Sequence, residues 1–252
     1  MQGDLVWLLD PGHGGVINGV YQTPGKRSPV WPDGGQLYEG VFNRAIVRRI
    51  IAFCEKFGLK YYNIAPGEDD PHVATRANRA NKVMCAVNEA NPHASCVYIS
   101  VHGNASRQPN TGTGWEVFTA AGSHLSKTIA AVFYRKAEAM FSDRFLMRRG
   151  WDDDFPSKNG RFTVLTRTAM PSILTENFFY DNVNDYEFMV TDRGRAEIAW
   201  MHCLSMLEWQ NRHETDRHWL TYDVAGPVGD MYDMLIDDPG EMPVTNCHYL
   251  KT

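Results

Sequence analysis

LVWLLDPGHGG, residues 5–15, is the stretch that decides the fold class of this chain. The apolar run Leu5 to Leu9 is followed at once by Asp10-Pro11-Gly12, which is the pattern of a short buried strand that stops at a turn. The strand therefore carries the loop from Asp10 to Gly15 at its carboxyl end.

The segments beyond this loop alternate between short apolar runs and longer stretches with helical periodicity. Further strands are predicted at residues 59–64, 96–101, 115–119, 162–166 and 173–175. Helices are predicted at residues 38–57, 73–90, 125–140 and 193–209. Such alternation implies right-handed crossovers between strands. We therefore expect an α/β fold with a twisted, mostly parallel sheet of about six strands and helices on both faces.

Two segments depart from this alternation. Residues 16–35 are rich in Gly and Pro and are expected to form a functional surface loop, because long loops seldom persist without a function. From residue 214 onward the alternation stops, and prolines recur at positions 227, 239 and 243. We expect one domain over residues 1–213 and a C-terminal extension, residues 214–252, packed on it.

The composition argues against two classes of partner. The formal net charge is -5 and the basic residues are scattered, whereas nucleic acid and anionic membranes require a concentrated basic surface. No stretch approaches the roughly 20 apolar residues that span a bilayer. We therefore expect neither nucleic-acid binding nor membrane insertion.

The N-terminus and the cysteines bear on the cellular compartment. The segment before Leu5 lacks the basic region of a secretory signal, and the apolar run that follows is too short for one. The five cysteines are odd in number and show no CxxC spacing, which suits a reduced cytosol. We expect a protein made in the cytoplasm without a signal peptide. The alternative is a leader that has been removed, which would place the protein in the periplasm or outside the cell.

Two of the nine histidines lie where ligands gather in such a sheet, just beyond the carboxyl ends of strands. His13 follows the first strand, and His102 ends the third strand in the sequence YISVHGNA. Glycines beside both histidines allow a metal or a substrate to approach the backbone. A single loop histidine is more often a surface residue, but two at adjacent strand ends indicate a metal site.

A third metal ligand is needed, because a catalytic zinc usually takes three protein ligands and leaves a fourth position open. Glu39 is the leading candidate, since it enters the helix that follows the loop carrying His13. A helix start that faces the strand ends would point its carboxylate into the same cleft. The alternative is a carboxylate placed to interact with the positive end of the helix dipole.

Glu176 ends the apolar run SILTE, residues 172–176. An acid in this position is costly unless it is used or paired. Beside a zinc site, Glu176 would accept a proton from the attacking water and then return one to the leaving group. The alternative is an ion pair with a neighbouring arginine such as Arg167.

Four motifs carry a resemblance to a known family: DPGHGG at residues 10–15, Glu39 with Asn43, SVHGNA at residues 100–105, and PSILTENF at residues 171–178 with Asn182. In this order they resemble the zinc-dependent amidase_3 family of N-acetylmuramoyl-L-alanine amidases. RANRAN, residues 76–81, is similar to an arginine-rich helix of that family. The resemblance implies zinc as the cofactor, with His13, Glu39 and His102 as its ligands and Glu176 as the catalytic glutamate.

The resemblance also implies the substrate, which is the amide bond between N-acetylmuramic acid and L-alanine in peptidoglycan. Residues 1–213 would then be the catalytic domain, and the protein would act on the cell wall after release, as an endolysin does. Gly103 and Asn177 stand where the family commonly has alanine and a small residue, which implies a differently shaped substrate groove. Residues 143–159 are expected to form a solvated acidic loop, the alternative being a cover over the cleft.

Two other functions fit parts of this pattern. A zinc carboxypeptidase or another peptidoglycan amide hydrolase would share the metal and the base, but would recognise a free C-terminus through an arginine such as Arg76, Arg79 or Arg167. A wall-binding module would keep the fold and lose the chemistry. The intact ligand and glutamate positions argue against the second alternative.

Overall fold

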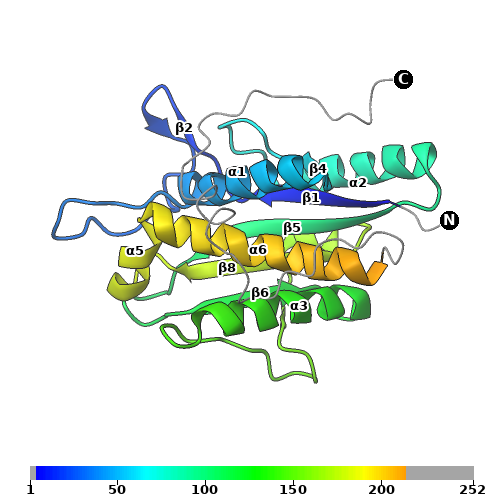
Figure 1. The fold of residues 1–252 in the computed structure, drawn as a ribbon. Coiled ribbons are helices and arrows are strands. Elements are labelled where there is room, and N and C mark those ends of the chain that lie inside the picture. The colour runs from blue at the N-terminus through cyan, green and yellow to red at the C-terminus, as the bar shows by residue number, and fades with distance from the viewer. Residues whose placement is uncertain (1–3, 214–252) are drawn as a thin grey trace.

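The computed structural model describes residues 4–213, so the expected extension over residues 214–252 lies outside the described residues. Its centre is a six-stranded sheet in the order β4-β1-β5-β8-β6-β7 (Figure 1). The strands are β1 Leu5–Pro11, β4 Lys60–Asn63, β5 Ser95–Asn104, β6 Trp115–Thr119, β7 Lys158–Asn159 and β8 Ser172–Phe179. The helices are α1 Glu39–Phe57, α2 Val73–Ala90, α3 His124–Phe141, α4 Thr163–Thr166, α5 Val183–Met189 and α6 Asp192–His213.

Most strand pairs in the sheet are parallel, as expected. β1 pairs with β4 and β5, and β5 pairs with β8, all in the parallel sense. β6 is antiparallel to β8, and β7 is parallel to β6. The expected α/β fold with a mostly parallel six-stranded sheet is confirmed.

Helices cover both faces of the sheet and bury separate apolar clusters. On one face, α6 lies between α1 and α3 (Figure 1), and Trp7 and Leu9 of β1 pack in the cluster that these helices close. On the other face, Leu8 and Tyr98 pack with the side chains of α2 and α4. Successive residues of β1 thus enter opposite clusters, which explains why this strand is apolar throughout rather than alternating.

The α1 helix shows how the sequence sets this packing. Phe42, Ile46, Ile50 and Phe53 recur at helical spacing, and each is at most 1% exposed. The helix ends at Phe57 and is capped by Gly58, whose φ of 69° is the left-handed conformation that glycine adopts without steric cost. The chain then enters β4 beside β1.

The strand predicted at residues 162–166 is wrong, because Thr163–Thr166 form the short helix α4. The backbone N–H of Thr166 donates to the carbonyl of Phe162. The edge of β6 is already paired with Lys158–Asn159, so residues 162–166 have no strand to join there. Thr, Val and Phe favour strands mainly through the packing that a sheet provides.

Residues 16–35 form a loop, as expected, but it begins with a small hairpin. The hairpin pairs β2, Val16–Ile17, with β3, Val20–Tyr21. Asn18 and Gly19 turn the chain between them with φ values of 50° and 77°, the positive angles of a tight two-residue hairpin turn. The hairpin projects from the sheet near the N-terminal end of α1 (Figure 1).

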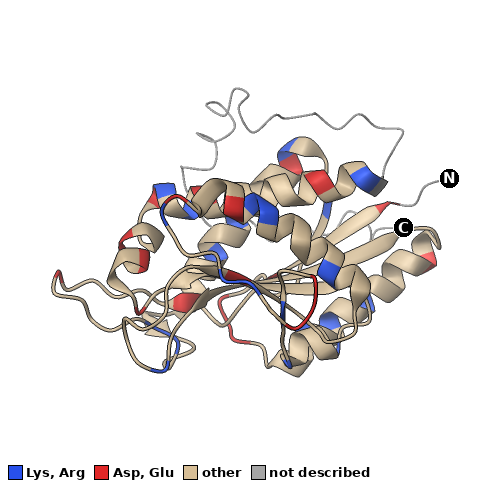
Figure 2. Ribbon diagram, turned by 90° about the horizontal axis from the view of Figure 1, so that it is seen from below, with Lys and Arg blue, Asp and Glu red and all other residues tan. Residues whose placement is uncertain are grey.

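Acidic and basic residues are mixed along the described part of the chain (Figure 2). Figure 2 shows acidic and basic residues interspersed along the helices and loops. None of the helices within residues 4–213 combines the length and hydropathy needed to cross a bilayer. Four cysteines fall in this part of the chain, and all four are free thiols: Cys54, Cys85, Cys96 and Cys203.

Candidate metal centre

Three expected ligands lie together at the carboxyl edge of the sheet. His13 follows β1, Glu39 is the first residue of α1, and His102 lies near the end of β5. Glu39 Oε1 is 3.2 Å from His13 Nε2 and 3.0 Å from His102 Nδ1. One donor atom from each residue falls within 4.8 Å of the others. The topology therefore brings together residues that are up to 89 positions apart (102 minus 13).

Glycines make the close approach of these elements possible. A Cβ on Gly12 would lie 2.1 Å from His102 Cε1, and a Cβ on Gly40 would lie 1.8 Å from the carbonyl oxygen of Gly14. His13 itself has a φ of 63°, which is uncommon for a residue with a side chain. The loop after β1 is thus held in a conformation that directs His13 toward Glu39.

Two buried arginines hold this loop in place. Arg76 donates to Asp10 Oδ1 at 2.6 Å and to the carbonyl oxygens of Pro11 and His13. Arg44 donates to the same His13 carbonyl at 2.8 Å. Burial opposes ionisation of Asp10, but the charge of Arg76 and the hydrogen bond from Tyr98 outweigh it and lower the pKa of Asp10. The ionised carboxylate and the arginines stabilise the loop together.

Outer groups that the sequence analysis did not single out orient the cluster. Tyr98 and Ser100 donate to Asp10 Oδ2 at 2.5 and 3.0 Å, and Ser100 Oγ lies 3.1 Å from His102 Nε2. Tyr180 donates to Glu39 Oε2 at 3.3 Å. The sequence could have revealed Ser100, because it is a polar residue inside an apolar strand. Nothing in the neighbouring sequence distinguishes Tyr180.

The electrostatics of the cluster favour an ionised glutamate beside neutral histidine. Burial opposes ionisation of Glu39, but hydrogen bonds with His102 and His13 outweigh it and lower the pKa of Glu39. Burial also lowers the pKa of His102, although Glu39 opposes this effect. Metal ligands must present a carboxylate and unprotonated imidazole nitrogens, so both shifts suit a cation site.

The donor set fits zinc. Imidazole nitrogens and a carboxylate oxygen are usual ligands of catalytic zinc. Donors that share a tetrahedral zinc at about 2.1 Å lie roughly 3.4 Å apart. The separations of 3.2 and 3.0 Å from Glu39 Oε1 to the two histidine nitrogens are close to that value.

Glu176 lies beside this cluster on the neighbouring strand. It is directly opposite His102 in the parallel register of β5 and β8. Its Oε2 is buried without a hydrogen-bond partner, and within residues 4–213 no ion pair joins it to Arg167. Burial, and then the charges of Glu39 and Glu116, raise the pKa of Glu176 well above its ordinary value. A half-buried carboxyl with one buried, unpaired oxygen is suited to proton transfer.

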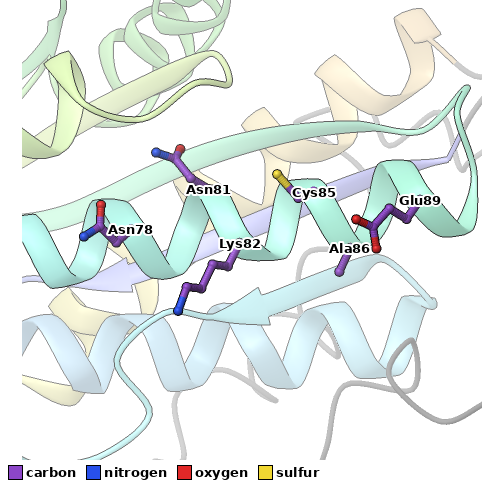
Figure 3. Close-up of a pocket in the computed structure, with 6 residues that line it drawn as sticks. All are labelled: Asn78, Asn81, Lys82, Cys85, Ala86 and Glu89. Carbon is purple, nitrogen blue, oxygen red and sulfur yellow. The ribbon is translucent and has the colours of Figure 1, made fainter.

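A separate shallow pocket lies away from the cluster. It has a volume of about 450 Å³ and is formed by residues of α2 alone (Figure 3). Its lining residues are Asn78, Asn81, Lys82, Cys85, Ala86 and Glu89. None of these side chains belongs to the His13–Glu39–His102 cluster.

An α/β sheet with a cluster of two half-buried histidines and a buried glutamate, next to a carboxyl with an unpaired oxygen, has the architecture of a metal-dependent hydrolase. Within that class, the chain belongs to the Amidase_3 family, described as N-acetylmuramoyl-L-alanine amidase, whose sequence profile matches residues 8–208. The match includes the cluster and Glu176.

Two characterised relatives share about a quarter of their residues with this chain. An endolysin of Bacillus phage SPP1 is 26% identical over 211 residues, which cover 82% of this chain and 66% of the relative. The N-acetylmuramoyl-L-alanine amidase CwlM of Bacillus licheniformis is 26% identical over 194 residues, which cover 76% of this chain and 63% of the relative. The matched region thus spans less than two thirds of the length of either relative.

Solved structures share the fold. An N-acetylmuramoyl-L-alanine amidase from Clostridium difficile 630 superposes with a TM-score of 0.64 at 20% identity, covering 85% of this chain and 100% of its own. The amidase AmiC2 of Nostoc punctiforme gives a TM-score of 0.63 at 21% identity, with coverages of 84% and 100%. The sheet and its helices are therefore common to these proteins.

Proposed function

We propose that this protein is a zinc-dependent N-acetylmuramoyl-L-alanine amidase, which hydrolyses the amide bond between N-acetylmuramic acid and L-alanine in peptidoglycan. Family membership supports the reaction. The single observation that carries the proposal is the position of Glu176, unpaired and directly opposite His102 of the His13–Glu39–His102 cluster.

His13, Glu39 and His102 would hold the zinc ion, through His13 Nε2, His102 Nδ1 and a carboxylate oxygen of Glu39. When bound, zinc supplies the Lewis acidity that polarises an amide carbonyl and activates water near neutral pH. Tyr180 and Ser100 keep Glu39 and His102 in orientation through their hydrogen bonds. Outer partners of this kind fix the direction in which ligand atoms point.

Glu176 would act as the general base and then as the general acid. Its carboxylate accepts a proton from the attacking water, and the protonated carboxyl then donates to the nitrogen of the leaving L-alanine. Burial and the charges of Glu39 and Glu116 raise the pKa of Glu176, which helps the carboxyl to retain the proton between the two steps. The absence of an ion pair within the described residues leaves its carboxyl free for this exchange.

The carboxypeptidase alternative is less well supported, because the three arginines named for it, Arg76, Arg79 and Arg167, are engaged or distant. Arg76 is buried and bonded to Asp10, and Arg79 donates to the carbonyl of Ile64. Arg167 precedes the start of β8, whereas Glu176 lies toward its carboxyl end. A wall-binding module without chemistry does not explain a buried, unpaired Glu176.

The endolysin relative supports action on the cell wall. We propose that the protein reaches the wall after release from the cytoplasm in which it is made. The role of residues 1–213 as the catalytic domain, with an extension beyond it, is part of the same proposal.

Digestion of purified peptidoglycan tests the function. The expected products are peptides with a new L-alanine amino terminus and glycan strands whose lactyl carboxyls are free, identified by mass spectrometry. Glu176→Gln should release both products much more slowly than wild-type protein. Release of single C-terminal amino acids, with the sugar–peptide bond intact, would instead establish a carboxypeptidase.

A further inference from the structure

Glu116 of β6 belongs to the same row of side chains as the candidate centre. It lies directly opposite Glu176 in the antiparallel register of β6 and β8, and Glu176 lies opposite His102. Directly paired residues on neighbouring strands point to the same face of a sheet. His102, Glu176 and Glu116 therefore form a line that runs from the cluster toward the β6 side.

Glu116 binds two cations and one amide. Arg148 Nε donates to Glu116 Oε2 at 2.9 Å, and Lys158 Nζ donates to the same oxygen. Asn104 Nδ2 donates to Oε1 at 2.7 Å. Glu116 is 5% exposed, and each oxygen of its carboxylate accepts at least one of these hydrogen bonds. The two positive charges that contact Glu116 outnumber its single negative charge.

Arg148 has capacity to bind a second anion. Within residues 4–213 the only hydrogen bond from its side chain runs from Nε, so the two terminal nitrogens of its guanidinium are available. Its guanidinium carbon lies 5.1 Å from the centre of the Phe179 ring, which holds the planar group in one orientation. The side chains of Arg148 and Lys158 are 32% and 26% exposed, so both are reachable from solvent.

We propose that Arg148 and Lys158 form a subsite that binds a carboxylate on the peptide portion of the substrate. The inference rests on the proposed function. In a muramoyl-peptide the sugar's own lactyl carboxyl is consumed in the scissile amide, so the remaining carboxylates belong to the peptide. Binding one of them at the Arg148–Lys158 subsite places the peptide over β6 and the sugar on the β5 and β1 side of Glu176.

The competing explanation is that the two cations serve only to neutralise Glu116. One cation suffices for that, and Asn104 already satisfies the other oxygen. A purely structural role also predicts no effect of substrate charge on the reaction. The two explanations are therefore distinguished by the preference between charged and uncharged substrates, and not by the level of activity alone.

The test uses an N-acetylmuramoyl-tetrapeptide with free carboxylates and the same compound with those carboxylates converted to carboxamides. We expect wild-type protein to favour the acid form in kcat/KM by roughly tenfold or more, since charge-assisted pairs contribute at least that factor. Arg148→Gln should lose most of this preference, through a higher KM for the acid form. Arg148→Lys should retain part of it.

Arg135→Gln is the matched control, because Arg135 shares Glu208 with Lys136 and Arg212 on α3 and α6, another arrangement in which several cations contact one carboxylate. This control should keep the wild-type preference. Lys158→Met provides a second variant in case Arg148→Gln folds poorly. Equal hydrolysis of both substrates by wild-type protein, or an unchanged preference in Arg148→Gln or Lys158→Met, would overturn the subsite. Hydrolysis of neither substrate by wild-type protein would refute the proposed function itself.

Discussion

Glu176 of β8 lies directly opposite His102 of β5 in the parallel register, and both side chains face the same side of the sheet. The register alone thus sets a carboxyl beside the candidate metal cluster. Neither residue depends on a mobile loop for this position, because both belong to central strands of the sheet. The two roles proposed here, metal ligand and proton carrier, follow from this pairing.

Glu176→Gln should reduce the rate of muramoyl-peptide hydrolysis by roughly 10² to 10⁴, which is the usual contribution of a general acid–base residue. The same variant should be at least as stable as wild-type protein, because it removes a buried carboxyl with no partner within the described residues. Thermal unfolding and steady-state rates measure both effects. Glu138→Gln, at an exposed position on α3, should change neither. A lower stability together with an unchanged rate would contradict the assignment.

Tyr180→Phe should weaken zinc binding about 10-fold to 100-fold, because it removes the hydroxyl that donates to Glu39 Oε2. Competition with a chelator of known affinity measures the change. Tyr134→Phe is the control, since the hydroxyl of Tyr134 bonds only to the carbonyl of Met147 among the described contacts. Equal zinc affinity in both variants would show that the Tyr180 hydroxyl does not support zinc binding by Glu39.

Asp10→Asn should destabilise the protein by about 3 kcal/mol, because it removes the buried anion that pairs with Arg76 at 2.6 Å and leaves only the longer contact to the more exposed Asp70. Chemical denaturation measures the free energy of unfolding. Asp4→Asn, at a more exposed residue near the start of β1, should cost much less. A similar small cost at both positions would mean that Arg76 holds the loop through its carbonyl contacts and Asp70, without help from Asp10.

His202 of α6 should make the stability of the protein fall at acidic pH. Burial lowers its pKa to about 4, although a hydrogen bond to Ile198 opposes the shift. The unfolded chain, with an ordinary histidine pKa of about 6.5, binds the proton first as the pH falls. The stabilising contribution is complete above pH 6.5 and is lost between about 6.5 and 4.

The size of this effect is on the order of 3 kcal/mol for a fully buried group with such a shift. His202→Gln lacks this titration and should show a flatter dependence of unfolding free energy on pH across that window. Its amide can still serve Thr175 and Ile198, the two hydrogen-bond partners of the imidazole. Parallel pH profiles for the two proteins would contradict the proposed cause.

Much of the fold follows from local sequence patterns. The helix predicted at residues 73–90 and the strand predicted at residues 115–119 have the bounds observed for α2 and β6. The strand predicted at residues 173–175 is longer in the structure. It continues through Glu176 and Asn177, which are polar and so interrupt the apolar pattern on which the prediction rested. Asn177 accepts from Trp115 Nε1 and donates to the carbonyl of His102. Such long-range partners are invisible in the local sequence.

Some residues of the candidate site are likewise marked by the local sequence, and others are not. His13 and His102 are marked by their positions after apolar strands, and the structure brings them together with Glu39. Tyr180 and Glu116 carry no comparable local mark, because their relevance depends on which strands become neighbours. The antiparallel pairing of β6 with β8, which sets Glu116 opposite Glu176, is a property of the whole sheet.

Zinc binding and hydrolysis measured on the same samples test the central claim most directly. Wild-type, Glu39→Gln and Glu176→Gln proteins are stripped of metal, titrated with zinc and assayed on a muramoyl-peptide. The account predicts one zinc per wild-type chain, at least about tenfold weaker binding in Glu39→Gln, and full zinc binding without hydrolysis in Glu176→Gln. Metal-free wild-type protein that hydrolyses the substrate at full rate, or Glu39→Gln that binds zinc as tightly as wild type, would contradict it.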